Sequence, residues 1–214
     1  MTTATARIHA DIGQNRLQQG LALWYLSFWL LTGIAPVDRR DWLLENFLVV
    51  VFSGLLVSTY RRFPLSDVSY VLITVYLTLH SIGAHYTYAE VDIFKFVRDL
   101  FGWQRNNYDK LGHFAQGFVP AIIAREILIR NKVVNGRAWL NLFVISICLA
   151  FSALYELFEW AVAAATGSSA DNFLGTQGYM WDTQSDMAMA LLGAVLALTF
   201  LSDLHDRQIP SRKT

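Results

Sequence analysis

Long apolar runs separated by short polar breaks are the dominant pattern of this chain. A helix needs about 20 predominantly apolar residues to cross the hydrocarbon core of a bilayer. Six runs approach or exceed that length, at about residues 17–37, 42–60, 68–85, 110–129, 139–165 and 187–204. We therefore predict an all-α, polytopic membrane protein with six transmembrane helices.

The polar connection over residues 86–107 carries a different pattern. Its apolar residues recur at helical spacing with charged residues opposite them: Val91, Phe94, Val97, Leu100 and Phe101. This pattern is typical of a short amphipathic helix that lies at the membrane interface. Because no internal repeat, low-complexity tract or linker interrupts the chain, we expect a single membrane domain over residues 1–214.

Composition agrees with the pattern. Of the chain, 54% is hydrophobic and only 16% is charged, whereas about a quarter of the residues of a soluble domain are charged. The formal net charge is zero and no basic stripe with interleaved aromatics is present, which argues against nucleic acid as a partner. The single cysteine, Cys148, permits no internal disulfide and no CxxC metal site, and its apolar surroundings predict a small buried side chain.

The distribution of basic residues predicts the orientation. Six spans place both termini on one side, together with Arg7, Arg16, Arg61, Arg62, Arg130, Lys132, Arg137, Arg207, Arg212 and Lys213. The opposite side has fewer: Arg39, Arg40, Lys95, Arg98, Arg105 and Lys110. The positive-inside rule therefore puts both termini in the cytoplasm. Residues 1–19 lack the apolar core of a cleaved secretory signal, so we interpret them as a cytoplasmic tail.

In this orientation, acidic and histidine side chains collect near the outer ends of four spans. In chain order they are His80, His85, Asp109, His113, Glu156, Glu159, Asp182 and Asp186. A titratable side chain inside a membrane span is costly and by default faces a partner. His80 and His85 diverge by about 140° around a helix, so we expect only one of them to point inward. His85, beside Tyr86 and Tyr88, also fits an aromatic belt at the interface.

This group of side chains predicts either shared protons or a bound metal. Several carboxylates in a low dielectric cannot all stay ionised unless a cation or a histidine compensates them. Histidine nitrogen with carboxylate oxygen suits zinc, manganese or iron, and an all-oxygen subset suits magnesium or calcium. The candidate ligands are His80, His113, Glu156, Glu159, Asp182 and Asp186. No HExxH motif is present.

Plainer structural roles are also open for several of these residues. Asp109 could cap the fourth span while Lys110 extends toward the interface, and Asp182 could cap the sixth span. Arg125 and Glu126 are adjacent and are expected to form an ion pair at the cytoplasmic end. Glu156, Glu159, His113 and Asp186 lie inside spans, where a purely structural hydrogen-bonded network is the alternative to a functional site.

Three sequence blocks resemble a known family. DKLGHF at 109–114, YELFEW at 155–160 and GTQGYMWDTQSDM at 175–187, followed by a Gly-containing apolar span, are similar to the YjdF-type inner-membrane family of bacteria. The likeness runs from about the second span to the sixth. It implies a helical membrane fold and a place in the bacterial inner membrane, and it implies no activity.

A more distant resemblance is to VanZ-like proteins, a small membrane family linked with glycopeptide resistance. The matching positions are Asp109, Lys110, His113, Phe114, Glu156, Asp186 and Gly193. The chain departs from that pattern at Glu159, where glutamine is usual, and at Ala190, where asparagine is expected. This resemblance implies that the fourth, fifth and sixth spans form one site.

Three functions fit these observations. The first is a membrane-embedded hydrolase or transferase that takes a lipid-like or amphiphilic substrate from the outer leaflet, with a divalent metal or an activated water. Its catalytic residues would be Asp109, His113, Glu156, Glu159 and Asp186, and the loop from 166 to 181 would act as a lid. The second is a proton- or cation-coupled transporter, and the third is a non-catalytic membrane subunit or assembly factor. Membrane lipid is the expected partner, and a homo-oligomer or a membrane partner protein is left open.

Overall fold

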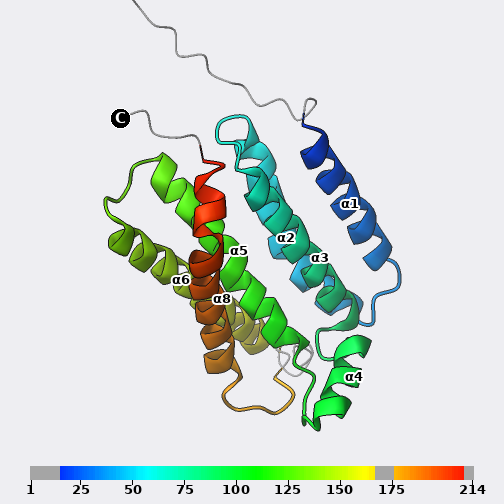
Figure 1. Cartoon of the computed structure of the whole chain (residues 1–214). Helices are drawn as coiled ribbons and strands as arrows, with labels where there is room; N and C mark the ends of the chain where they lie inside the picture. Colours follow the sequence, from blue (N-terminus) through cyan, green and yellow to red (C-terminus); the bar gives the residue numbers. More distant parts are fainter. Residues whose placement is uncertain (1–14, 167–175, 210–214) are drawn as a thin grey trace, which may run out of the picture.

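The computed structural model describes residues 15–166 and 176–209 and is all-helical there, as predicted. The helices are α1 (Arg16–Thr32), α2 (Arg39–Tyr60), α3 (Asp67–Tyr86), α4 (Asp92–Phe101), α5 (Tyr108–Arg130), α6 (Arg137–Thr166) and α8 (Asp182–Asp206). In Figure 1, α1, α2 and α3 form one side of the bundle and α5, α6 and α8 form the other. α3 packs against both α1 and α5 and so joins the two sides. The short α4 lies at the end of the bundle opposite the start of α1 and the end of α8.

Polar side chains set where the first three helices begin. Asn15, Asp38 and Ser66 each accept hydrogen bonds from backbone N–H groups of the following turn, which satisfies donors that have no partner within the helix. Asp38 therefore starts α2 at Arg39, three residues before the predicted start of the second span at about residue 42.

The first apolar run is only partly helical. It was predicted to span residues 17–37, but α1 ends at Thr32. Gly33 and Pro36 follow, and the Val37 N–H donates to the carbonyl of His85 at 2.9 Å. Gly33 and Ile34 still donate to carbonyls of α1, whereas Val37 is bonded to α3, a difference that hydropathy alone does not reveal.

Two glycines let α5 and α8 approach each other closely. A Cβ added at Gly117 would overlap the backbone of Ala190, and one added at Gly193 would overlap the backbone of Phe114. Small residues at a helix–helix contact allow such an approach inside membranes. The buried core beside this crossing comprises Ala121, Ile122, Ala124, Leu128, Val144, Cys148, Ala194, Ala197 and Leu198. Cys148 is thus the buried small side chain that its apolar surroundings predicted.

The α5–α8 crossing makes a sharp stability prediction. We expect Gly193→Ala to lower the free energy of unfolding by about 1–3 kcal/mol, because the added methyl has to displace helix backbone. Gly54→Ala is the matched control: its Cβ would meet no atom within 4 Å, so it should be neutral or stabilising by roughly 0.5–1 kcal/mol. Thermal unfolding of the purified proteins in detergent measures both. Equal melting temperatures for the two variants would contradict the close crossing.

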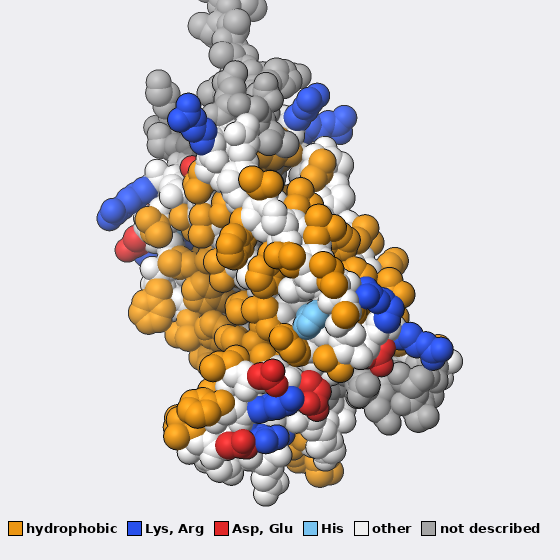
Figure 2. Space-filling view, turned by 90° about the vertical axis from the view of Figure 1, so that its right-hand side faces the viewer, with side chains coloured by type: hydrophobic (Ala, Val, Ile, Leu, Met, Phe, Trp, Pro, Cys, Tyr) orange, Lys and Arg blue, Asp and Glu red, His pale blue; other side chains and the backbone are white. Residues whose placement is uncertain are grey.

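Apolar side chains cover the outside of the bundle. Figure 2 shows them around the middle of one face, with charged side chains gathered toward the two ends. Exposed examples on three helices are Leu23, Leu30, Phe47, Leu55, Phe151 and Leu157. Within the described ranges, α2, α3, α6 and α8 are long and apolar enough to cross a membrane. α1, with 17 residues, and the more polar α5 are not among them.

The predicted amphipathic helix is present as α4, but its apolar residues face two ways. Phe94 packs edge-on against Tyr108 with ring centroids 5.1 Å apart, and Val91 is buried just before the helix. The exposed apolar side chains of α4 are Ile93, Phe96, Leu100 and Phe101. An exposed apolar face of this kind on a short charged helix is what a membrane interface accommodates.

Candidate functional site

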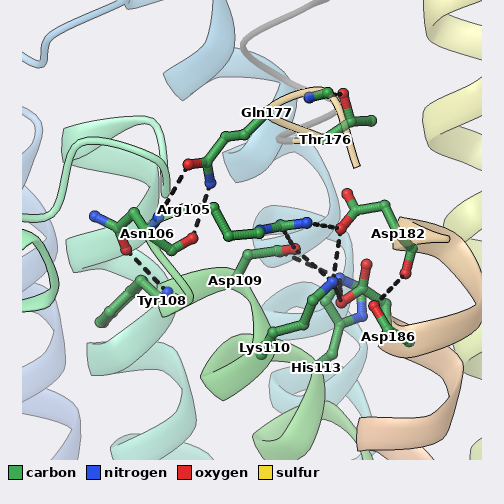
Figure 3. Close-up of polar contacts among 12 residues, drawn as sticks. Arg105, Asn106, Tyr108, Asp109, Lys110, His113, Thr176, Gln177, Asp182 and Asp186 are labelled. Carbon is green, nitrogen blue, oxygen red and sulfur yellow. Dashed lines mark hydrogen bonds and ion pairs between the residues drawn. The ribbon is translucent and has the colours of Figure 1, made fainter. Parts of the chain in front are cut away.

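Lys110 links the first turns of α5 and α8. Its Nζ donates to Asp182 Oδ1 at 2.7 Å and to Asp186 Oδ1 at 2.6 Å. From the connection before α5, Arg105 donates to the same Asp182 oxygen at 2.5 Å. Figure 3 shows these side chains converging from the two helix ends. Two cations and two carboxylates thus fix the ends of α5 and α8 together.

The alternative of simple helix capping does not describe Asp109 and Asp182. The N-cap positions are occupied by Asn107 and Trp181, neither of which caps through its side chain. Both aspartates lie in first turns, where a negative charge is favoured by the helix dipole, and both point toward Arg105.

His113 lies next to this ionic link and is surrounded by carboxylates. Its Nε2 is 3.3 Å from Asp109 Oδ1 and 3.9 Å from Asp186 Oδ1. Its Nδ1 faces Glu156 Oε1 at 3.7 Å. Both of these facing atoms are buried, and neither has a hydrogen-bond partner in the part of the chain that the structure describes. The imidazole is therefore held from one side and unengaged on the other.

Three of the predicted site residues form a group that could hold a metal ion. One ligand atom from each of Asp109, His113 and Asp186 lies within 4.8 Å of the others. Of the candidate ligands, His80, Glu156, Glu159 and Asp182 are not part of this group. The Lys110 ammonium already places a positive charge on Asp186, so a metal here would have to share that carboxylate with it.

A pocket opens beside His113, with an empty volume of about 370 Å³ that includes its mouth. Its lining comes from four helices and from the residue Tyr88 between α3 and α4: Glu45, Tyr76, His80, Tyr88, Asp109, Gly112, His113, Gln116, Tyr155 and Glu159. The predicted residues Asp109, His113, Glu159 and His80 thus share one pocket. Glu156 and Asp186 are not among the lining residues but lie within 4 Å of His113, and Asp182 is bonded to Lys110.

Several residues of the pocket lining form an interconnected set of polar groups. Tyr88 Oη lies 2.6 Å from His80 Nδ1, and His80 Nε2 lies 3.2 Å from the carbonyl oxygen of Glu45. Tyr155 Oη donates to Glu45 Oε2 at 3.1 Å. Glu45 is absent from the residues predicted above, although an acid inside an apolar run is itself the signal for such a site.

Tyr88 is held in place by unusual backbone geometry. Thr87 and Tyr88 both have positive φ, 58° and 51°, a conformation that costs about 1 kcal/mol or more per residue without glycine. The Tyr88 ring fills the space above two glycines: an added Cβ would lie 2.5 Å from the ring at Gly83 and 3.1 Å from it at Gly112. Burial raises the pKa of the Tyr88 hydroxyl well above its ordinary value, so the hydroxyl keeps its proton.

The two histidines of α3 separate as expected. His80 is directed into the pocket, while His85 Nδ1 lies 2.7 Å from the carbonyl of Thr32 at the end of α1.

Of the predicted lid, residues 167–175 lie outside the described part of the chain. At its far end, Gln177 binds the backbone of Asn106 through both its side-chain oxygen and its nitrogen, as Figure 3 shows.

At the other end of α5, the predicted ion pair between Arg125 and Glu126 does not form. Glu126 is bonded to Arg130, to His205 at 3.2 Å, and to Ser66 and Ser69. Arg125 reaches His205 and Asp206 instead. The prediction was wrong because adjacent residues diverge by about 100° around a helix, so each meets a different neighbour.

The comparisons with known proteins give the family. The sequence model described as "Predicted membrane protein (DUF2238)" matches residues 17–207. The chain belongs to the DUF2238 family. It is also 48% identical over 180 residues to the "Inner membrane protein YjdF" of Escherichia coli (strain K12), covering 84% of this chain and 86% of that protein. No solved structure matches the chain.

Membership of the DUF2238 family confirms the YjdF-type resemblance and makes this chain a membrane protein. The VanZ-like resemblance stays a prediction. The DUF2238 match contains every residue of the pocket and of the α5–α8 ionic link, so the site lies within the family domain. Neither the family description nor the name of the relative states a reaction, so the chemistry has to be argued from the site.

Proposed function

We propose that this protein is a membrane-embedded hydrolase or transferase that acts on a lipid-like, amphiphilic substrate. The observation that supports it is the environment of His113. Asp109 orients the imidazole from Nε2, and the other nitrogen, Nδ1, faces Glu156 without a hydrogen-bond partner in the described chain. An imidazole fixed by a carboxylate on one side and unengaged on the other is the arrangement of a general acid–base group.

In this proposal, His113 and Glu156 move the proton of the reaction. The oxygen of a water or of an acceptor alcohol attacks an ester-type centre of the substrate and loses its proton to this pair. As the bond to the leaving oxygen breaks, the pair returns the proton to that oxygen. Hydrolysis and transfer then differ only in the attacking oxygen. Lys110 fixes Asp186 beside the imidazole and keeps the ends of α5 and α8 in register.

The proposal includes the placement of the site in the bilayer. All six long helices cross the membrane as one domain, both termini are cytoplasmic, and the pocket opens near the outer surface. Two observations support this: the described chain starts and ends at one end of the bundle, and the polar face of α5 is enclosed by α3, α6 and α8. An amphiphile could then reach the pocket from the outer leaflet with its chains still in lipid.

The test is turnover by purified protein in nanodiscs against a panel of amphiphilic esters and phospholipids. We expect His113→Ala and Glu156→Gln each to lower the rate by about 10²–10⁴-fold, as for other general acid–base groups. Glu90→Gln is the control, since Glu90 lies outside the pocket lining. Gel filtration and melting temperature check that each variant is folded. Full activity in folded His113→Ala protein would contradict the proposal.

Elemental analysis of the same preparations decides the part played by a metal. A divalent metal at one equivalent that is absent from His113→Ala protein would place it at Asp109, His113 and Asp186, where it would activate the attacking water. Metal in neither sample would leave the proton transfer to His113 and Glu156 alone.

A further inference from the structure

We infer that the pocket binds an organic cation, so that the substrate of the proposed function carries an amine or quaternary ammonium headgroup. This inference rests on the proposed function, because the same pocket is involved. It adds the chemical class of the headgroup, which neither the family description nor the relative supplies.

The lining of the pocket is acidic, and the described residues that form it include no lysine or arginine. Three carboxylates contribute to it, from Glu45 on α2, Asp109 on α5 and Glu159 on α6. The shortest contacts of the two nearby cations are with Asp182 and Asp186, at 2.5–2.7 Å. Lys110 and Arg105 are farther from Asp109, at 3.7 and 3.8 Å, and neither reaches Glu45 or Glu159. Ionised carboxylates in this lining would attract a cation and repel a phosphate group.

Among the described residues, Glu159 is the carboxylate of the pocket lining that has no partner. Its residue is only 8% exposed, yet it forms no hydrogen bond or ion pair with any residue of the described ranges, and it lines the pocket. A buried charge without compensation is costly, whereas a buried charge that meets an opposite charge is stabilised. Glu159 therefore offers a place for the positive group of a ligand.

Aromatic rings form much of the rest of the lining. Tyr76, Tyr88 and Tyr155 contribute their side chains, and the imidazoles pack against them, with His113 and Tyr155 centroids 5.8 Å apart. Ring faces attract ammonium groups, most strongly where water is excluded. Carboxylates combined with tyrosine rings recognise an organic cation better than a bare metal ion, which prefers direct oxygen or nitrogen ligands.

The position of the Tyr88 ring is fixed before any ligand binds. Gly83 and Gly112 leave the space in which the Tyr88 ring lies, and the positive φ of Thr87 and Tyr88 turns it there. The pocket is partly open, so a headgroup could enter it while the chains of an amphiphile remain outside. Preformed sites of this kind lose little ordering entropy on binding.

Calorimetry with three probes of equal chain length tests the inference: hexyltrimethylammonium, hexyl phosphate and hexyl glucoside, added to protein in an uncharged detergent. We expect only the ammonium probe to bind, and tetramethylammonium to compete with it. Glu159→Gln should weaken this binding at least tenfold. Tyr155→Leu should weaken it as well, while Tyr155→Phe, which keeps the ring, should lose less. Glu90→Gln, a change outside the lining, should leave it unchanged.

Several outcomes would overturn the inference. They are equal binding of the glucoside, no binding of any probe to wild type, and undiminished ammonium binding by Glu159→Gln protein. Preference for hexyl phosphate would also overturn it and would assign an anionic headgroup. Because this assay measures binding without turnover, each of these results leaves the acid–base proposal for His113 to be decided by its own rate measurement.

Discussion

Replacing Lys110 with methionine is expected to lower the free energy of unfolding by about 3–5 kcal/mol, as for other buried ion pairs that lose one partner. The Lys110 side chain is 15% exposed, and those of Asp182 and Asp186 are 7% and 3% exposed. Without the ammonium, Asp186 would keep its burial and lose its nearest cation. For a chain of this size, the loss corresponds to a fall in melting temperature of roughly 6–20 °C, which intrinsic tryptophan fluorescence in detergent can follow.

The double variant Lys110→Met with Asp186→Asn separates this cause from a general disturbance of α5. Since it also removes a carboxylate charge, we expect it to recover part of the lost stability. Lys95→Met is the surface control: Lys95 pairs with Glu90 at 2.8 Å, with side chains 36% and 55% exposed. Exposed pairs contribute about 0–1 kcal/mol. A Lys110→Met protein no less stable than the Lys95→Met control would contradict the buried link.

Glu126→Ala is expected to be comparably damaging at the other end of α5. The Glu126 carboxylate accepts from the backbone of Ser66 at 2.9 Å, from the Ser69 hydroxyl at 2.8 Å, and from Arg130 at 2.8 Å. His205, which is fully buried, lies against it at 3.2 Å. Its removal leaves several groups without their acceptor at once, so we expect a loss of about 3–5 kcal/mol.

Asp206→Ala is the matched control for this second prediction. Asp206 also accepts from a buried arginine, Arg125, but its own side chain is 55% exposed. Water can replace it, so the expected loss is below about 1 kcal/mol. Chemical unfolding monitored by fluorescence compares the two variants directly. If both lose the same stability, the Glu126 network contributes no more than a surface pair.

The sequence predicted the long helices well because apolar runs and caps act locally. α3 was expected at 68–85 and is found at Asp67–Tyr86, where Ser66 supplies the start. The end of α1 was missed because residues after Thr32 stay apolar, while the Val37 N–H bonds to a distant helix. Hydropathy records composition and carries no information on such a partner.

The site was predictable in part for the same reason. Sorting acids and histidines by depth along their spans brought together Asp109, His113, Glu156 and Asp186, which do lie close to one another. Tyr88 was interpreted only as part of an aromatic belt at the interface. Its place in the pocket was missed because it depends on positive φ and on two glycines of different helices. That arrangement arises only from tertiary packing, which a single sequence does not express.

The polarity of α5 has a consequence for how the chain is made. Charged groups lie toward both of its ends, and their partners Asp182, Asp186 and His205 all belong to α8. α8 leaves the ribosome last among the described helices. A charged side chain within a membrane span is costly unless it meets a partner. Under the proposed six-span arrangement, Lys110 of α5 gains its carboxylate partners only once α8 has been made, so we expect the two helices to enter the bilayer as a pair.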